Sequence, residues 1–75
     1  MEKLGNLTRR EYEVIALISQ GYQNKEIAIT LSIAEHTVEQ HLRHIYQKLG
    51  VGNRTEASVI FRIVISDSQY SENPL

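Results

Sequence analysis

The stretch that most narrows the possible folds of this 75-residue sequence runs from residue 34 to residue 49 and reads AEHTVEQHLRHIYQKL. Its apolar residues recur at the three- and four-residue spacing of one helix face, namely Val38, Leu42, Ile45 and Leu49. Polar side chains occupy the outward positions, namely Glu39, Gln40, Arg43 and Gln47. The stretch therefore predicts an amphipathic helix whose outer face is rich in hydrogen-bonding groups.

Length and composition exclude several classes of protein. A chain of 75 residues holds one domain with a small core, so dimerisation would help its stability. The sequence has no cysteine, which excludes a disulfide framework and a thiolate metal site. Its charged N-terminus does not resemble a signal peptide, and its longest apolar run, residues 59–65, is interrupted by Arg62 and too short to span a bilayer. We therefore expect a soluble, cytoplasmic protein without a membrane partner.

Two shorter helices are predicted before the central stretch. Thr8 and Glu11 have the spacing of a capping box, which starts a helix over residues 8–20 that Gly21 ends. Asn24 suits the N-cap of a second helix over residues 25–31. Only a few residues then precede the helix over residues 35–49. So short a connection predicts the steep crossing of a helix-turn-helix.

A fourth helix is predicted over residues 54–66, although its segment VIFRIVI is β-branched and resembles a strand by propensity alone. A lone strand would have no partner elsewhere in this sequence. As a helix, the segment turns Ala57, Ile60, Phe61 and Val64 toward the body. Val59 and Ile63 then lie on another side, which a second chain would cover.

These patterns predict an all-α fold with four helices, over residues 8–20, 25–31, 35–49 and 54–66. We expect one domain over residues 7–66. A flexible lead would precede it over residues 1–6, and a disordered tail would follow it over residues 67–75.

Six blocks of the sequence together resemble a known family. They are Leu7-Thr8-x-Arg10-Glu11-x-Glu13-Val14, Gly21, Asn24-Lys25-Glu26-Ile27-Ala28, Thr37-Val38-x-x-His41, Ile45-x-x-Lys48-Leu49-x-Val51 and Arg54-x-x-Ala57. In this order they are similar to the DNA-binding domain of the LuxR-type (GerE-like) bacterial transcription regulators, over residues 7–65. The resemblance implies four helices, of which the second and third form the helix-turn-helix. The third would lie in the major groove, and the fourth would make a dimer interface.

Three positions depart from the family pattern. The family usually has Ser or Thr where this chain has Gln23, Ser where it has Ala34, and Lys where it has Glu39. Ala34 lacks the side-chain cap expected before the third helix, which Glu35 partly offsets near the positive end of the helix dipole. Glu39 repels phosphate, but it can accept a hydrogen bond from cytosine N4.

The outer face of the third helix supplies the candidate base contacts, Glu39, Gln40 and Arg43. Arg43 can pair with guanine O6 and N7, and Gln40 with adenine N6 and N7. The competing interpretation of these residues is an ordinary solvated helix face. The candidate dimer contacts are Val59 and Ile63.

Phosphate contacts that position the domain are predicted for Lys25, Thr37, Lys48 and Arg54. For Arg54 a structural role competes with this one. An ion pair between Arg54 and either Glu11 or Glu26 would tie the fourth helix to the first two.

We expect no metal, cofactor, small-molecule ligand or enzymatic activity. His41 and His44 have i, i+3 spacing, but no nearby carboxylate completes an obvious metal site. The sequence also lacks a nucleophile elbow and a glycine-rich phosphate loop.

Charge leaves two functions open. The net charge of −1 is unfavourable for nucleic-acid binding, although residues 24–54 carry a small positive excess. The first hypothesis is a sequence-specific DNA-binding homodimer that regulates transcription, with double-stranded DNA as its partner and RNA polymerase as a further candidate. The alternative is a dimerisation or protein interaction module that has lost most DNA affinity because of Glu39.

A third hypothesis concerns the length of the protein: the chain would be the output domain of a longer regulator, although Met1 and a short polar lead favour a stand-alone chain.

Overall fold

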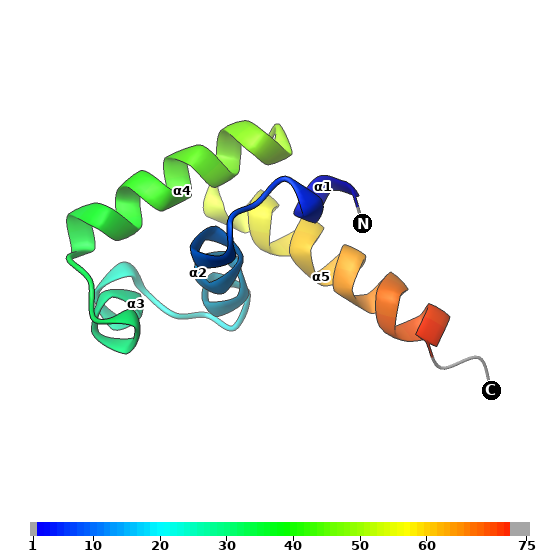
Figure 1. Cartoon of the computed structure of the whole chain (residues 1–75), viewed down its shortest axis with the longest axis horizontal. Helices are drawn as coiled ribbons and strands as arrows, with labels where there is room; N and C mark the ends of the chain where they lie inside the picture. The colour runs from blue at the N-terminus through cyan, green and yellow to red at the C-terminus, as the bar shows by residue number, and fades with distance from the viewer. Residues whose placement is uncertain (1, 73–75) are drawn as a thin grey trace.

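The computed structural model describes the backbone of residues 2–72 and the side chains of residues 4–66. Over this part the chain is helical, with no strand, which confirms the all-α prediction. Its helices are α1 (Glu2–Gly5), α2 (Arg9–Ser19), α3 (Asn24–Leu31), α4 (Glu35–Leu49) and α5 (Arg54–Glu72) (Figure 1). None of these helices is both long enough and apolar enough to cross a membrane.

The predicted caps of α2 are confirmed. Thr8 Oγ1 accepts a hydrogen bond from the Glu11 N–H at 3.1 Å, and Glu11 Oε1 accepts one from the Thr8 N–H at 2.9 Å. After the helix, Gly21 takes a left-handed φ of +94°. The Tyr22 N–H then donates to the Leu17 carbonyl at 3.1 Å, so the chain folds back over the last turn.

The predicted N-cap of α3 is wrong by one residue. Gln23 holds the extended cap position, and its N–H donates to Glu26 Oε1 at 2.7 Å. Asn24 is instead the first helical residue, and its Oδ1 accepts a hydrogen bond from Arg54 Nη1 at 3.0 Å. The Asn24 side chain is therefore used to hold α5 and is not free to cap α3.

α4 ends as predicted, and its start lacks a cap as predicted. Ala34 stands at the N-cap in extended conformation and offers no side-chain acceptor. Gly50 ends the helix with a left-handed φ of +70°. The N-terminal turn of α4 is therefore less well stabilised than that of α2, where Thr8 supplies the acceptor.

We expect Ala34→Ser to raise the free energy of unfolding by about 1 kcal/mol, because its hydroxyl would accept a hydrogen bond from a free N–H of the first turn. For a domain of this size the gain corresponds to a rise in Tm of about 4–8 °C. Thermal unfolding followed by circular dichroism measures it. Ala34→Val, which adds bulk without an acceptor, is the matched control. An unchanged Tm for Ala34→Ser, or an equal rise for both variants, would contradict the capping explanation.

Both ends of the described chain hold more helix than predicted. The lead that we expected to be flexible contains α1, where the Leu7 N–H donates to the Leu4 carbonyl at 3.1 Å and Leu4 packs against the core. α5 continues through Glu72, so residues 67–72 of the expected disordered tail are helical. Once the packed turns have formed, each added residue gains a hydrogen bond, and the first helix breaker is Pro74. The rest of that expectation, residues 73–75, lies outside the described residues.

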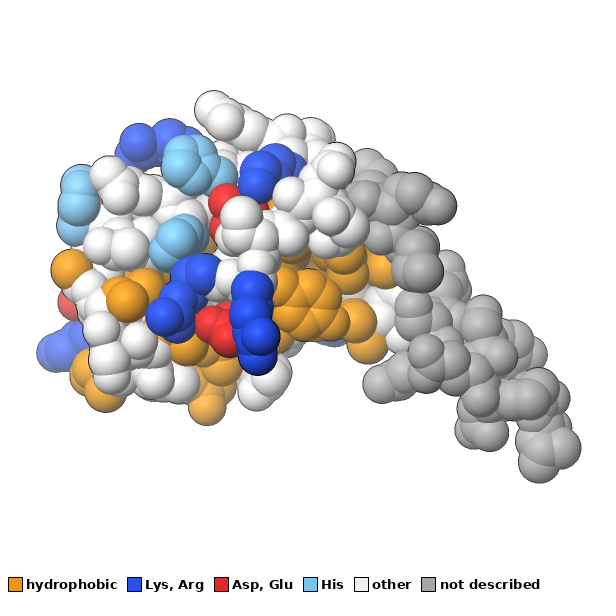
Figure 2. Space-filling view, viewed as in Figure 1, with side chains coloured by type: hydrophobic (Ala, Val, Ile, Leu, Met, Phe, Trp, Pro, Cys, Tyr) orange, Lys and Arg blue, Asp and Glu red, His pale blue; other side chains and the backbone are white. Residues whose placement is uncertain are grey.

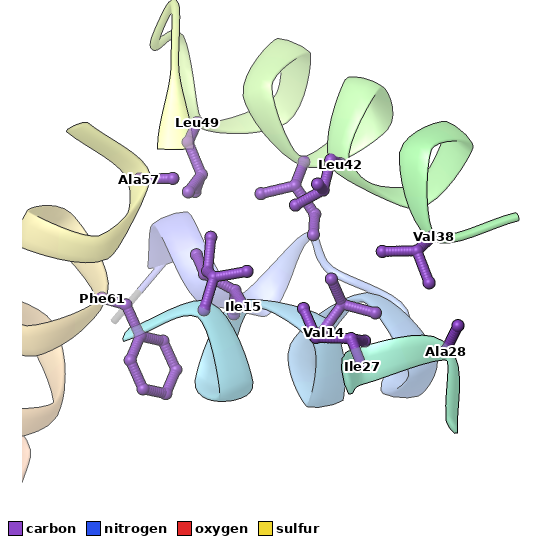
Figure 3. Close-up of a cluster of buried hydrophobic side chains, with 11 residues drawn as sticks. Val14, Ile15, Ile27, Ala28, Val38, Leu42, Leu49, Ala57 and Phe61 are labelled. Atoms are coloured by element: carbon purple, nitrogen blue, oxygen red, sulfur yellow. The ribbon is translucent and has the colours of Figure 1, made fainter. Parts of the chain in front are cut away.

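α2 lies at the centre of the fold and packs against α4 on one side and α5 on another, while α3 packs against α4 (Figure 1). Figure 3 shows the buried side chains converging between these helices. The small Ala28 of α3 lies near Val38 of α4, where the two helices approach each other (Figure 3). The buried hydrophobic residues are Val14, Ile15, Ile18, Ile27, Ala28, Val38, Leu42, Ile45, Leu49, Ala57 and Phe61.

Candidate nucleic-acid interface

The polar face of α4 is exposed, as its periodicity predicts. The side chains of Glu39, Gln40, Arg43 and Gln47 lie at the surface, behind which the whole apolar stripe of the helix is buried. α4 runs along the upper edge of the molecule in Figure 1, and the three histidines of the chain gather over it in Figure 2. An exposed helix of this kind has the width that the major groove of B-DNA admits, about 12 Å.

A shallow hollow is set into this face. It has a volume of about 250 Å³ and is lined by Glu39, Leu42, Arg43 and Tyr46. Two of the three predicted base contacts therefore border one depression. The sequence interpretation missed Tyr46, because it lies between the buried stripe and the polar face.

Lys48 has a partner inside the protein. Its Nζ lies 2.7 Å from Glu11 Oε1, and the Glu11 side chain is only 5% exposed. Burial alone would raise the pKa of Glu11. The hydrogen bonds from Lys48 and Thr8 and the charge of Lys48 outweigh burial and hold that pKa below its ordinary value. Glu11 therefore caps α2 and also fixes the last turn of α4.

His44 also lies beside this carboxylate, with its Nδ1 3.8 Å from Glu11 Oε2. The sequence interpretation placed no carboxylate near the histidines, because Glu11 is far from them along the chain. Within the described residues, however, no three side chains of the His, Cys, Asp or Glu types come together in a group that could hold a metal ion.

Arg54 ties the start of α5 to the turn between α2 and α3. Its guanidinium donates to Asn24 Oδ1 at 3.0 Å and to the Tyr22 carbonyl. The structural role that we weighed for Arg54 is therefore present, but its partners are not the predicted Glu11 or Glu26. A neutral amide and a backbone carbonyl take their place.

The other two predicted phosphate contacts lie in the first turns of the helix-turn-helix. Lys25 is exposed at the start of α3, and Thr37 is half-buried at the start of α4. Free N–H groups at helix N-termini favour anions, so both positions are compatible with a phosphate.

One side of α5 exposes large hydrophobic side chains. Val59 is 46% exposed and Ile63 is 56% exposed, and the two lie one turn apart. On the opposite side of the helix, Phe61 is buried against Tyr12, with ring centroids 5.4 Å apart and an interplanar angle of 71°. α5 is therefore apolar on two sides, of which one packs against the rest of the domain and the other is about half exposed at Val59 and Ile63.

Comparison with known proteins adds independent information. The family model described as bacterial regulatory proteins, luxR family, matches residues 5–61. Similar curated proteins include the HTH-type transcriptional regulator MalT of Yersinia pestis (strain Pestoides F), of Yersinia pseudotuberculosis serotype O:1b (strain IP 31758) and of Serratia proteamaculans (strain 568). Each is 51% identical over 51 residues, which cover 68% of this chain and 6% of the relative. The chain thus spans only a small part of these relatives.

Proposed function

We propose that this chain, which belongs to the luxR family of bacterial regulatory proteins, binds specific DNA sequences by laying α4 in the major groove. The observation that carries the proposal is the outer face of α4, which keeps Glu39, Gln40 and Arg43 exposed on a helix whose opposite face is buried. In this arrangement Arg43 reads guanine, Gln40 reads adenine and Glu39 accepts a hydrogen bond from cytosine N4.

Phosphate contacts in the proposal come from Lys25, Thr37, Lys48 and Arg54. Lys48 and Arg54 already have partners, but an ammonium has three donors and a guanidinium has five. Their remaining N–H groups can bond phosphate, while Glu11 and Asn24 hold the side chains in position.

The proposed active form is a homodimer joined through Val59 and Ile63 of α5. Two-fold symmetry would then present two copies of α4 to half-sites about 34 Å apart, one turn of B-DNA. We place the protein in the cytoplasm, where it would act on transcription with RNA polymerase as a further partner.

A second candidate function is a protein interaction module that keeps the fold without DNA affinity. Glu39 favours it, because an exposed carboxylate on the reading face repels phosphate. The net charge of −1 acts in the same direction.

Two experiments decide between the DNA reader and the protein interaction module. They are selection from randomised double-stranded DNA and affinity measurements at several salt concentrations. We expect selection to enrich one sequence. We expect Arg43→Ala to weaken its binding about 5- to 150-fold and to relax preference at one base pair, since a bidentate contact contributes about 1–3 kcal/mol.

Arg9→Ala is the matched control, because it removes the same charge from α2, where the Arg9 side chain is 94% exposed. If both variants weaken binding equally, Arg43 acts only through its charge. If no sequence is enriched and low-salt binding is absent, the interaction module replaces the DNA reader.

A further inference from the structure

The hollow on α4 is lined by one apolar, one aromatic and two charged side chains. Leu42 is 5% exposed and Tyr46 is half-buried. Glu39 and Arg43, which are both exposed, complete the lining. The four residues follow i, i+3, i+4, i+7 spacing, so they share one face of the helix.

The phenol of Tyr46 adds no charge to this hollow. Burial raises its pKa above the ordinary value, against the opposing effect of the nearby Arg54 charge. Tyr46 is therefore neutral at physiological pH and contributes mainly the face and edge of its ring.

The chemistry of such a hollow matches one feature of the major groove. Each base pair presents hydrogen-bonding groups there, and thymine alone adds an apolar group, its C5-methyl. Water held in a shallow apolar hollow makes few hydrogen bonds, so its displacement by a methyl group is favourable. Leu42 and Tyr46 offer apolar contact next to the two charged residues that the proposed function assigns to base edges.

We propose that Tyr46, together with Leu42, reads the C5-methyl group of a thymine next to the bases contacted by Glu39 and Arg43. This inference rests on the proposed function and extends it, because it makes Tyr46 a specificity-determining residue. Arg43, Gln40 and Glu39 would recognise hydrogen-bonding patterns, and Tyr46 would recognise shape and apolar surface.

Single thymine-to-deoxyuridine replacements test the inference, because they remove only the methyl group and leave base pairing intact. The probe is the DNA sequence enriched by selection, with each thymine replaced in turn. We expect one replacement per half-site to weaken binding about fourfold, the factor that corresponds to ~0.8 kcal/mol for one buried CH₂ group. The other replacements should have no effect.

Three variants connect that effect to Tyr46. Tyr46→Phe keeps the ring and should keep the difference between thymine and uracil. Tyr46→Ala and Tyr46→Gln should bind both DNA probes equally. Circular dichroism checks that each variant is folded. If Tyr46→Ala does not fold, Tyr46→Gln, which is polar and compatible with a helix, takes its place in the test.

The outcomes separate this inference from the proposed function. If the parent protein binds its selected DNA but shows no uracil-sensitive position, the methyl contact is wrong and the DNA reader stands. The same conclusion follows if no thymine is enriched, or if folded Ala and Gln variants keep the preference. If the parent protein selects no DNA, both proposals fail.

Discussion

Lys48→Met is expected to lower the free energy of unfolding at pH 7 by about 2 kcal/mol. This value lies between the cost of breaking a buried ion pair, ~3–5 kcal/mol, and that of breaking an exposed one, ~0–1 kcal/mol. Lys48 Nζ lies 2.7 Å from a Glu11 carboxylate that is almost fully buried, whereas the Lys48 side chain is itself 34% exposed. The variant leaves the carboxylate charged without its main cation. In a domain of this size Tm should fall by about 8–16 °C.

This loss should depend on pH in a defined direction. In the parent protein the pKa of Glu11 is held below its ordinary value, against burial, by Lys48 and Thr8. A group with a lowered folded pKa stabilises the protein above its unfolded pKa, and this stabilisation is lost as the pH falls through the folded pKa. The difference in Tm between parent and variant should therefore be full at pH 7 and shrink below about pH 4, near the pKa of an unperturbed glutamate.

Arg10→Met provides the matched control. Arg10 Nη1 lies 3.1 Å from Glu13 Oε1, but both side chains are about two-fifths exposed. Its loss should cost less than about 1 kcal/mol. Thermal unfolding of the three proteins between pH 3 and pH 7 makes the comparison. Equal losses in the two variants, or a Lys48→Met loss that does not change with pH, would rule out the buried pair as the cause.

The positions of α2, α3 and α4 could be predicted because each depends on neighbours in sequence. The spacing of Val38, Leu42, Ile45 and Leu49 permits one buried face on α4. Helix termini also have local signals, and the structure confirms two of them. Thr8 and Glu11 form the capping box that starts α2, and Gly50 ends α4.

The remaining features depend on how distant elements meet. Gln23 and Asn24 are both compatible with a helix start, and the structure places Gln23 at the N-cap while the Asn24 side chain bonds Arg54, a residue 30 positions away along the chain. The contact between Lys48 and Glu11 follows from the way α2 and α4 pack, which periodicity does not specify. Tyr46 is different, because its hollow lies within α4 alone. The sequence does not single it out, since it lies between the buried stripe and the polar face of the helix, next to Leu42, which periodicity assigns to the core.

Ile63→Glu is expected to convert the proposed homodimer into a monomer. Val59 and Ile63 are about half exposed and lie one turn apart on α5, on the side opposite the buried Phe61. In a two-fold symmetric interface each residue acts twice, so one substitution places two carboxylates in the same apolar contact. Both would be desolvated and would repel each other.

DNA binding should report the same change. Joining two DNA-reading units raises affinity for paired half-sites by about 10²–10⁴ over that of one unit. The affinity of Ile63→Glu should therefore be about 100-fold lower than that of the parent protein for DNA with two half-sites, and almost unchanged for DNA with one half-site. Val59 and Ile63 take no part in the proposed DNA contacts, so a direct effect on base reading is not expected.

Sedimentation of the parent protein and Ile63→Glu measures the first effect, and titration with single and paired half-sites measures the second. Ile29→Glu is the matched control for sedimentation, because Ile29 is 70% exposed on α3, outside the proposed dimer surface. It should remain dimeric. A monomeric parent protein, or identical sedimentation of the parent and Ile63→Glu, would remove α5 as the dimer interface. DNA binding would then involve a single copy of α4, with one set of base contacts and the phosphate contacts of one chain.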